Sequence, residues 1–289
     1  MKHNYQVIFL LISLFLLSQI TGLYLLNQSL ETVEENGVFY LEYEPTALGE
    51  RPDASPEATL LMIIIGLTIG TALLLLLIKY NKVNIWRYWF FLGTTVMIAL
   101  ALSVLINTLL AWILAVIIAT LRIKKTNIIT QNLAEVLMYA GLAVFIVPLL
   151  NIPIMIILLI LISIYDMYAV WKSKHMIRMA EFTSKSQLFP GLSLKYNENS
   201  ESVKKSRKTK KTGMLGGGDV AFPLLFTGVV MTSLIEQGVT KTMAFQQSLI
   251  ITLTTAIALM LLLILGQKQK FYPAMPFITL GLIIGFLLI

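Results

Sequence analysis

Three acidic residues of this chain lie in apolar segments, where a carboxylate is energetically unfavourable. Of the 15 acidic residues in this 289-residue chain, only Glu135, Asp166 and Asp219 lie within long apolar segments. A carboxylate in the hydrocarbon layer of a membrane is strongly disfavoured, so such residues are candidates for a functional site. Counting from the nearest lysines, Asp166 lies about 9 Å and Asp219 about 12 Å inside consecutive apolar segments. We therefore expect these two aspartates at similar depth on adjacent helices.

Two carboxyl groups at one buried level favour sharing a proton, because like charges in a dry site do not both ionise cheaply. One group then acts as a base on water while the other, protonated, polarises a carbonyl. This is peptide hydrolysis by an aspartyl dyad, and it predicts a loss of activity at high pH. The same pair would also suit a proton or cation pathway in a transporter or channel. Depth alone leaves both functions open.

The composition excludes a soluble protein. Hydrophobic residues make up 57% of the chain and charged residues 13%, whereas soluble domains carry about 25% charged residues. The chain has no cysteine, which excludes disulfides and thiolate chemistry. Its two histidines, His3 and His175, lie outside the apolar segments, which excludes a serine protease with a buried histidine base and an H-E-x-x-H metalloprotease. We expect no metal and no organic cofactor.

The hydropathy pattern predicts an all-α, polytopic membrane protein with nine transmembrane helices. One crossing takes about 20 residues, and residues 88–121 are too long for one crossing, so we expect a hairpin of two short helices broken at Asn107 and Thr108. The first apolar segment has no signal-peptide cleavage site after it and is expected to be retained. Apart from the hairpin at 88–121, the predicted spans are Val7–Leu26, Ala58–Ile78, Ile128–Leu149, Pro153–Trp171, Leu215–Ile235, Thr242–Gly266 and Phe271–Ile289.

Basic residues predict the orientation. With the N-terminus in the cytoplasm, all but two of the 22 lysines and arginines fall on the inner side, the exceptions being Arg51 and Lys241. Lys and Arg concentrate in cytoplasmic loops. We therefore expect a multi-pass protein of the cell membrane with its N-terminus and loop 172–212 in the cytoplasm and its C-terminus outside. The basic run Lys204–Lys211 is expected to act as a topogenic signal with affinity for anionic lipid. It lacks interleaved aromatics, so we expect no nucleic-acid binding.

Three parts follow from this map. Residues 1–171 hold the first six helices, with an acidic outer loop at 27–57 that is either a solvated surface loop or a gate for substrate. Residues 172–212 form a cytoplasmic hydrophilic loop, and residues 213–289 hold the last three helices.

Three short motifs lie on the helices that carry the aspartates and on the last helix. They are Tyr165-Asp166, Gly216-Gly217-Gly218-Asp219 and Pro273-Ala274-Met275-Pro276. In this order and within nine spans, they resemble the presenilin and signal peptide peptidase family of intramembrane aspartyl proteases, and the compact chain is similar to an archaeal-type presenilin homologue. The family usually has Pro-Ala-Leu in the third motif, and Met275 replaces that leucine with similar volume and apolarity.

The resemblance implies that Asp166 and Asp219 are catalytic and that Pro273, Ala274 and Met275 shape the site beside them. Tyr165 is implied as a lining residue. The implied substrates are single-span membrane proteins or signal-peptide-like helices in the lipid bilayer, cut near their cytoplasmic ends with their N-termini outside. A transporter would be supported by internal repeats, which we do not find, and a prepilin-type peptidase would not explain Pro-Ala-Met-Pro. Partner subunits and a homo-oligomer are left open.

A helical substrate must unwind before hydrolysis, which gives the glycines and prolines a role. We expect residues 216–218 to let a substrate backbone approach, and Pro223 to loosen the helix at Asp219 by leaving its carbonyl without a partner. The irregular start of the last helix, at residues 273–276, is expected to bind substrate as an added strand. Glu135 is expected to face the bundle, paired with Tyr, Ser or Lys, the alternative being a third proton-handling group.

Overall fold

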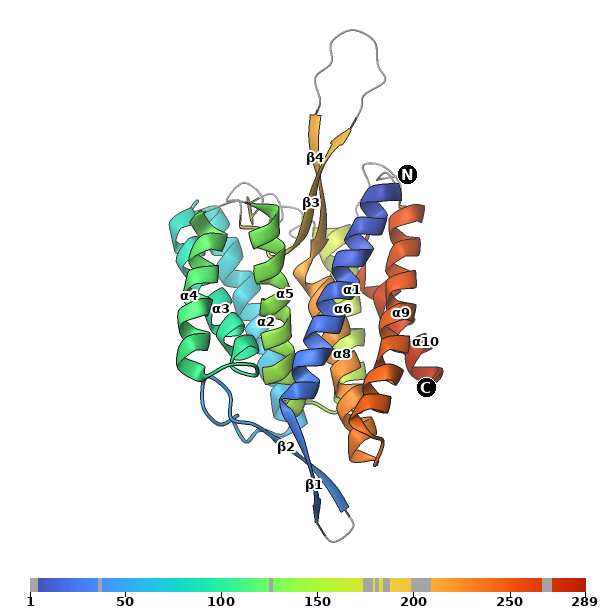
Figure 1. The fold of residues 1–289 in the computed structure, drawn as a ribbon. Helices are drawn as coiled ribbons and strands as arrows, with labels where there is room; N and C mark the ends of the chain where they lie inside the picture. Colours follow the sequence, from blue (N-terminus) through green and yellow to red (C-terminus); the bar gives the residue numbers. More distant parts are fainter. Residues whose placement is uncertain are drawn as a thin grey trace.

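The structure is a computed structural model that describes residues 5–35, 38–124, 127–173, 179, 182–183, 188–198, 209–266 and 272–289. Over these ranges, nine α-helices run side by side in one bundle (Figure 1). They are α1 Tyr5–Gln28, α2 Pro56–Lys79, α3 Val83–Leu102, α4 Thr108–Lys124, α5 Ile128–Ile146, α6 Ile152–Met167, α8 Gly217–Glu236, α9 Lys241–Leu265 and α10 Met275–Leu287.

Seven helical segments of the described chain are long and apolar enough to cross a membrane, with α6 reaching that length only together with the helical turn after it, as Ile152–Lys172. Helices α4 and α10 are too short for this, with 17 and 13 residues. The expected nine helices are confirmed, in a mostly helical polytopic fold. The break at Asn107 is also found, because α3 ends at Leu102 and the Asn107 side chain accepts a hydrogen bond from the Leu109 amide at the start of α4 (2.8 Å). Short polar side chains at such positions satisfy amides that a helix start leaves unpaired.

Two antiparallel hairpins extend from opposite ends of the bundle (Figure 1). The first joins β1 (Leu30–Glu35) to β2 (Val38–Tyr43), and the second joins β3 (Gly191–Glu198) to β4 (Thr209–Gly216). The sequence interpretation treated both regions as loops and missed these strands. Residues 204–208 of the predicted basic run lie outside the described residues.

The start of α8 differs from the prediction. A helix from Leu215 was expected to carry Asp219 well inside it, but Leu215 pairs with Leu192 in the hairpin and α8 begins at Gly217. Asp219 therefore lies in the first turn of α8. The helix starts late because Leu215 and Gly216 are paired with β3 in the hairpin. The expected loosening at Pro223 does not interrupt α8, which continues from Gly217 to Glu236.

The last helix also starts later than predicted, at Met275 instead of Phe271, and Phe271 lies outside the described residues. Proline in the first turn of a helix is tolerated because its missing amide would be unpaired there. Pro276 occupies such a position in α10. The segment Pro273–Ala274 before it is not helical.

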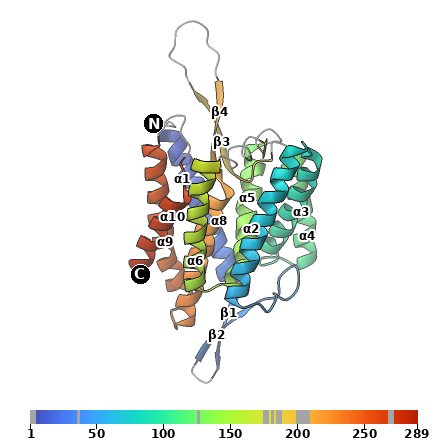
Figure 2. The ribbon, with the colours of Figure 1, turned by 180° about the vertical axis from the view of Figure 1, so that it is seen from behind.

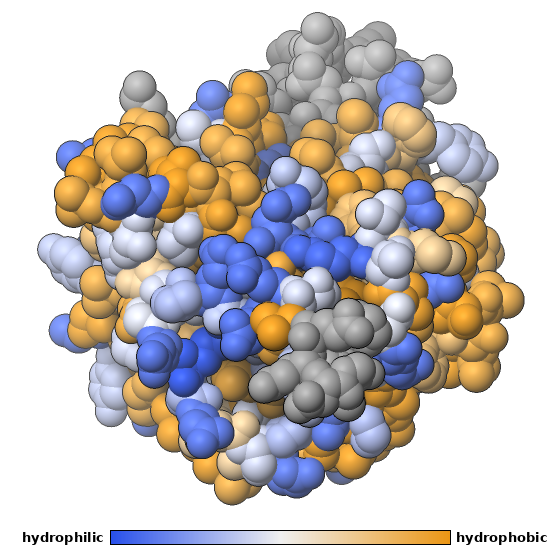
Figure 3. All heavy atoms as spheres, turned by 60° about the horizontal axis from the view of Figure 1, so that its bottom comes forward, coloured by the Kyte–Doolittle hydropathy of each residue, from blue (hydrophilic) through white to orange (hydrophobic). Residues whose placement is uncertain are grey.

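Burial differs sharply between helices. Helix α8 lies among α1, α5, α6, α9 and α10 and is the most buried candidate span, whereas α2 buries only Thr59 (Figure 2). Seen from the β1–β2 end, hydrophilic side chains gather over the end of the bundle and apolar ones flank it (Figure 3). An apolar belt with polar ends is what a bilayer requires of a multi-pass protein. The bundle thus surrounds the helix that carries Asp219.

Candidate active site

Asp166 lies near the end of α6 and is 5% exposed. Its Oδ2 accepts a hydrogen bond from the backbone amide of Met275, the first residue of α10, at 3.1 Å, and the Ala274 amide is a further donor. Amides at a helix start have no partner within the helix. The irregular start of α10 therefore supplies donors that hold this carboxylate.

The chain packs α6 against α10 and changes its helical winding near Asp166. Three residues before Asp166, the Ser163 hydroxyl lies 2.9 Å from the Thr279 hydroxyl of α10, and the two form a hydrogen bond. After Met167 the chain continues as a π-helical turn, Tyr168–Ser173. Such turns are frequent at functional sites.

Asp219 lies in the first turn of α8, close enough to Asp166 for the two negative charges to repel each other. A carboxylate in the first turn of a helix is favoured by the helix dipole. The backbone of Gly216 also forms a hydrogen bond with it. The structure thus brings together the two aspartates that the sequence singled out, from helices about fifty residues apart in the chain.

The three glycines before Asp219 have different surroundings. A Cβ added to Gly216 would lie 3.0 Å from Asp219 Oδ2, and one added to Gly217 would lie 2.9 Å from Tyr139 Oη and 3.2 Å from the Pro190 carbonyl oxygen. A Cβ on Gly218 would make only ordinary contact, 3.5 Å from Phe222. Internal packing therefore explains the first two glycines, and the exposed Gly218 is the one that leaves room for another backbone.

The remaining predicted site residues divide into two groups. Pro273, Ala274 and Met275 lie beside Asp166, and the Met275 side chain is buried. The backbone of residues 273–276 was expected to be available to substrate, and within it the Met275 amide donates to Asp166. Tyr165 precedes Asp166 on α6 and is 47% exposed, so about half of its side chain lies on the surface of the bundle.

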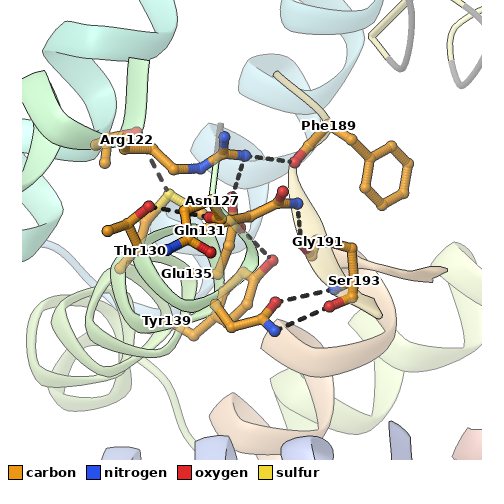
Figure 4. A network of polar contacts seen from close by, with 12 residues as sticks. Arg122, Asn127, Thr130, Gln131, Glu135, Tyr139, Phe189, Gly191 and Ser193 are labelled. Carbon is orange, nitrogen blue, oxygen red and sulfur yellow. Dashed lines mark hydrogen bonds and ion pairs between the residues drawn. The ribbon is translucent and has the colours of Figure 1, made fainter. Parts of the chain in front are cut away.

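A second polar cluster was only partly foreseen (Figure 4). Glu135 on α5 accepts a hydrogen bond from the Tyr139 hydroxyl at 2.8 Å, which fits the expected Tyr partner, and its other oxygen pairs with Arg122 at 3.4 Å. The spacing of four between Glu135 and Tyr139 places both on one helix face. Arg122 was counted only as a positive charge at the inner boundary, and no spacing in the sequence links it to Glu135.

Two other features do not add to the site. Within the described ranges, no group of three His, Cys, Asp or Glu side chains could hold a metal ion. A groove of about 460 Å³ between α9 and α10 is lined by apolar side chains such as Leu261 and Phe277, and neither aspartate lines it.

Comparisons with known proteins agree with this geometry. A family model described as signal-peptide peptidase, presenilin aspartyl protease matches residues 52–289. Two solved structures of a presenilin family intramembrane aspartate protease are similar in fold. One, in space group C222, has 18% identity and a TM-score of 0.60, and it covers 96% of this chain and 94% of its own. The other, in space group P2, has 19% identity and a TM-score of 0.59, with 96% and 95% covered. No curated protein sequence matches the chain.

Proposed function

The chain belongs to the signal-peptide peptidase and presenilin family of aspartyl proteases, and we propose that Asp166 and Asp219 are the catalytic pair of this intramembrane protease. One observation carries the proposal: the two carboxylates, from α6 and from the start of α8, lie within electrostatic reach of each other beside the start of α10. With one proton shared, one carboxylate takes a proton from water while the other polarises the scissile carbonyl.

The family acts on transmembrane substrates, and the hairpin β3–β4 supports an extended mode of binding at the site. On the edge of β3 that faces away from β4, the backbone of Ser193 already has a partner. Its amide and its carbonyl both bond the Asn132 side chain on α5, each at 2.9 Å. In the described chain β4 pairs only with β3. A substrate unwound near Gly218 would satisfy its backbone groups on the other edge of β4, as added strands do.

We propose single-span or signal-peptide-like helices as substrates, with their N-termini outside. This proposal rests on the orientation that the distribution of lysine and arginine favours, with the N-terminus and loop 172–212 in the cytoplasm. That loop joins the helices of residues 1–171 to those of residues 213–289. The start of α1 and the β3–β4 hairpin lie at one end of the bundle and the β1–β2 hairpin lies at the other (Figure 1), so the N-terminus and loop 172–212 fall on the same side of the membrane, whichever side that is.

The orientation is testable because the chain has no cysteine of its own. Ser206→Cys should react with a membrane-impermeant maleimide only after the cells are permeabilised. Asp53→Cys should react with the same reagent in intact cells. The reverse pattern would contradict the proposed orientation and the substrate direction that depends on it.

The catalytic pair is tested with purified protein in liposomes that also carry a tagged single-span reporter. Asp166→Asn and Asp219→Asn should each abolish cleavage, while Asp53→Asn, an exposed matched control far from the site, keeps the wild-type rate. Cleavage should also fall as pH rises and the shared proton is lost. A variant of either aspartate that still cuts, or a rate that stays flat into alkaline pH, would contradict the shared-proton pair.

A further inference from the structure

An ion pair lies buried between α4 and α5, outside the pair of aspartates. Arg122 and Glu135 are each 1% exposed, with Arg122 Nη2 lying 3.4 Å from Glu135 Oε1. The Tyr139 hydroxyl donates to Glu135 Oε2 at 2.8 Å, and the guanidinium lies over the Phe90 ring, 5.4 Å from its centre. Replacing a buried ion pair with apolar side chains often costs no stability. Fold stability alone therefore does not explain why these charges are here.

The charges hold a particular stretch of backbone, residues 189–193, where the chain enters β3 (Figure 4). Arg122 Nη2 donates to the Phe189 carbonyl at 3.0 Å, and Gln131 Nε2 donates to the Gly191 carbonyl at 3.4 Å. Farther along, Asn132 bonds both backbone groups of Ser193. Side chains from α4 and α5 thus fix this stretch of backbone at three residues.

The same stretch touches the start of α8. The Gly217 amide donates to the Pro190 carbonyl at 3.1 Å, and Gly191 pairs with Gly216 in the hairpin. The Tyr139 hydroxyl lies against the Cα of Gly217, where a Cβ would come within 2.9 Å of it. These contacts fall two and three residues before Asp219, so a shift of residues 189–193 would move the start of the catalytic helix.

We propose that Arg122, Glu135 and Tyr139 form a bracket that positions Asp219 through the backbone of residues 189–193 and Gly217. They are positioning residues, since the hydrogen bonds that tie them to the start of α8 run through the backbone of residues 189–193 and not through the Asp219 carboxylate. The proposal rests on the proposed function, because it takes Asp219 to be catalytic. A displacement of about 1 Å at a reacting group is enough to cost about 100-fold in rate.

If the bracket positions Asp219, removing one charge of the ion pair should lower kcat more than removing both. Glu135→Gln leaves Arg122 buried without its counter-charge, and Arg122→Gln does the same to Glu135, which a buried site tolerates poorly. Each single variant should lower kcat by about 10- to 100-fold with little change in KM. The double variant Arg122→Gln/Glu135→Gln leaves no buried charge unpaired and should recover part of kcat, the remaining loss being due to the missing hydrogen bond from Arg122 to the Phe189 carbonyl.

The readouts are kcat and KM for the reporter, binding of a hydroxyl-containing isostere of the tetrahedral intermediate, and thermal unfolding. The isostere should bind more weakly to the single variants, while substrate KM stays the same. Thr232→Val is the matched control, because this buried hydroxyl lies near the far end of α8, where it bonds the Val229 carbonyl of its own helix and the Tyr43 side chain of β2. It should leave kcat unchanged.

Each outcome decides the proposal. Wild-type kcat in a folded single variant overturns it, and so does a folded double variant without recovery, which would indicate that the carboxylate itself takes part in the chemistry. If the charge variants do not fold, Tyr139→Phe takes their place, and it should lower kcat several-fold with KM unchanged; wild-type kcat there overturns the bracket. Cleavage by Asp219→Asn would instead overturn the catalytic assignment, whatever the bracket variants do.

Discussion

The two aspartates are supported by two regions built in different ways. Asp166 is held directly, by amides at the irregular start of α10 and by the Ser163–Thr279 contact one turn away. Asp219 also has a backbone hydrogen bond, but that bond comes from Gly216, just before its own helix, and not from a distant part of the chain. Its position depends on Gly217, and through it on a stretch of backbone that α4 and α5 hold in place.

The difference shows how a membrane protein places a reactive group. On the Asp166 side, a proline-rich motif leaves backbone donors unpaired, and a carboxylate uses them. On the Asp219 side, glycines remove side chains so that the helix start fits against Tyr139 and Pro190. We therefore expect sensitivity to substitution to be local around Asp166 and spread over distant parts of the sequence around Asp219.

The largest expected effect comes from replacing the two aspartates themselves, because they are proposed to act together. If Asp166 and Asp219 share a proton, Asp166→Asn and Asp219→Asn should each lower kcat by about 1,000-fold or more, and the double variant should lose no more than either single one. Single-turnover cleavage of the reporter measures this. Losses that multiply in the double variant would mean that the two regions contribute independently.

Next in size is the effect of a methyl group at the start of α8. Gly217→Ala places a Cβ against the Tyr139 hydroxyl and the Pro190 carbonyl and should lower kcat by about 100-fold. Gly218→Ala has room for its Cβ and serves as the matched control, with kcat close to wild type and any change confined to KM. Equal losses of kcat in the two variants would contradict the tight fit proposed for Gly217.

On the Asp166 side the expected effect is smaller. Thr279→Val removes the hydroxyl that meets Ser163 at nearly constant shape, and one hydrogen bond contributes about 1 kcal/mol, or about five-fold in kcat if it is fully felt at the site. Thr279→Ser keeps the hydroxyl and should behave like wild type. A loss as large as that of Gly217→Ala would reverse the comparison between the regions.

The far end of the bundle should not affect kcat at all. Burial raises the pKa of Tyr43 on β2 to about 12, with Glu236 raising it further and Arg51 opposing. A raised pKa means that the folded state holds the proton of Tyr43 more tightly than the unfolded state does. The protonated group therefore contributes fully to the stability of the fold below about pH 10, and this contribution is lost between about pH 10 and 12. Tyr43→Phe should remove that part of the alkaline loss, seen by thermal unfolding against pH, and leave kcat unchanged.

Much of the fold could be predicted because membrane helices follow composition and length. The nine helices and the break at Asn107 were confirmed, and so was the membership in the family that three short motifs indicated. The start of α8 was predicted wrongly, because the apolar Leu215 fits a helix as well as a strand. Only the pairing of Leu215 with Leu192 decides between the two.

The sequence by itself determined which residues could do chemistry. A bilayer penalises each buried carboxylate, so three acidic residues stand out in the apolar segments of this chain without any knowledge of their neighbours. Tertiary structure alone decided what each of them contacts. Asp166 lies by the amide of Met275, 109 residues away in the chain, and Arg122 reaches Phe189 across 67 residues. Such contacts depend on how helices pack and where strands begin, and no local pattern of residue types records them.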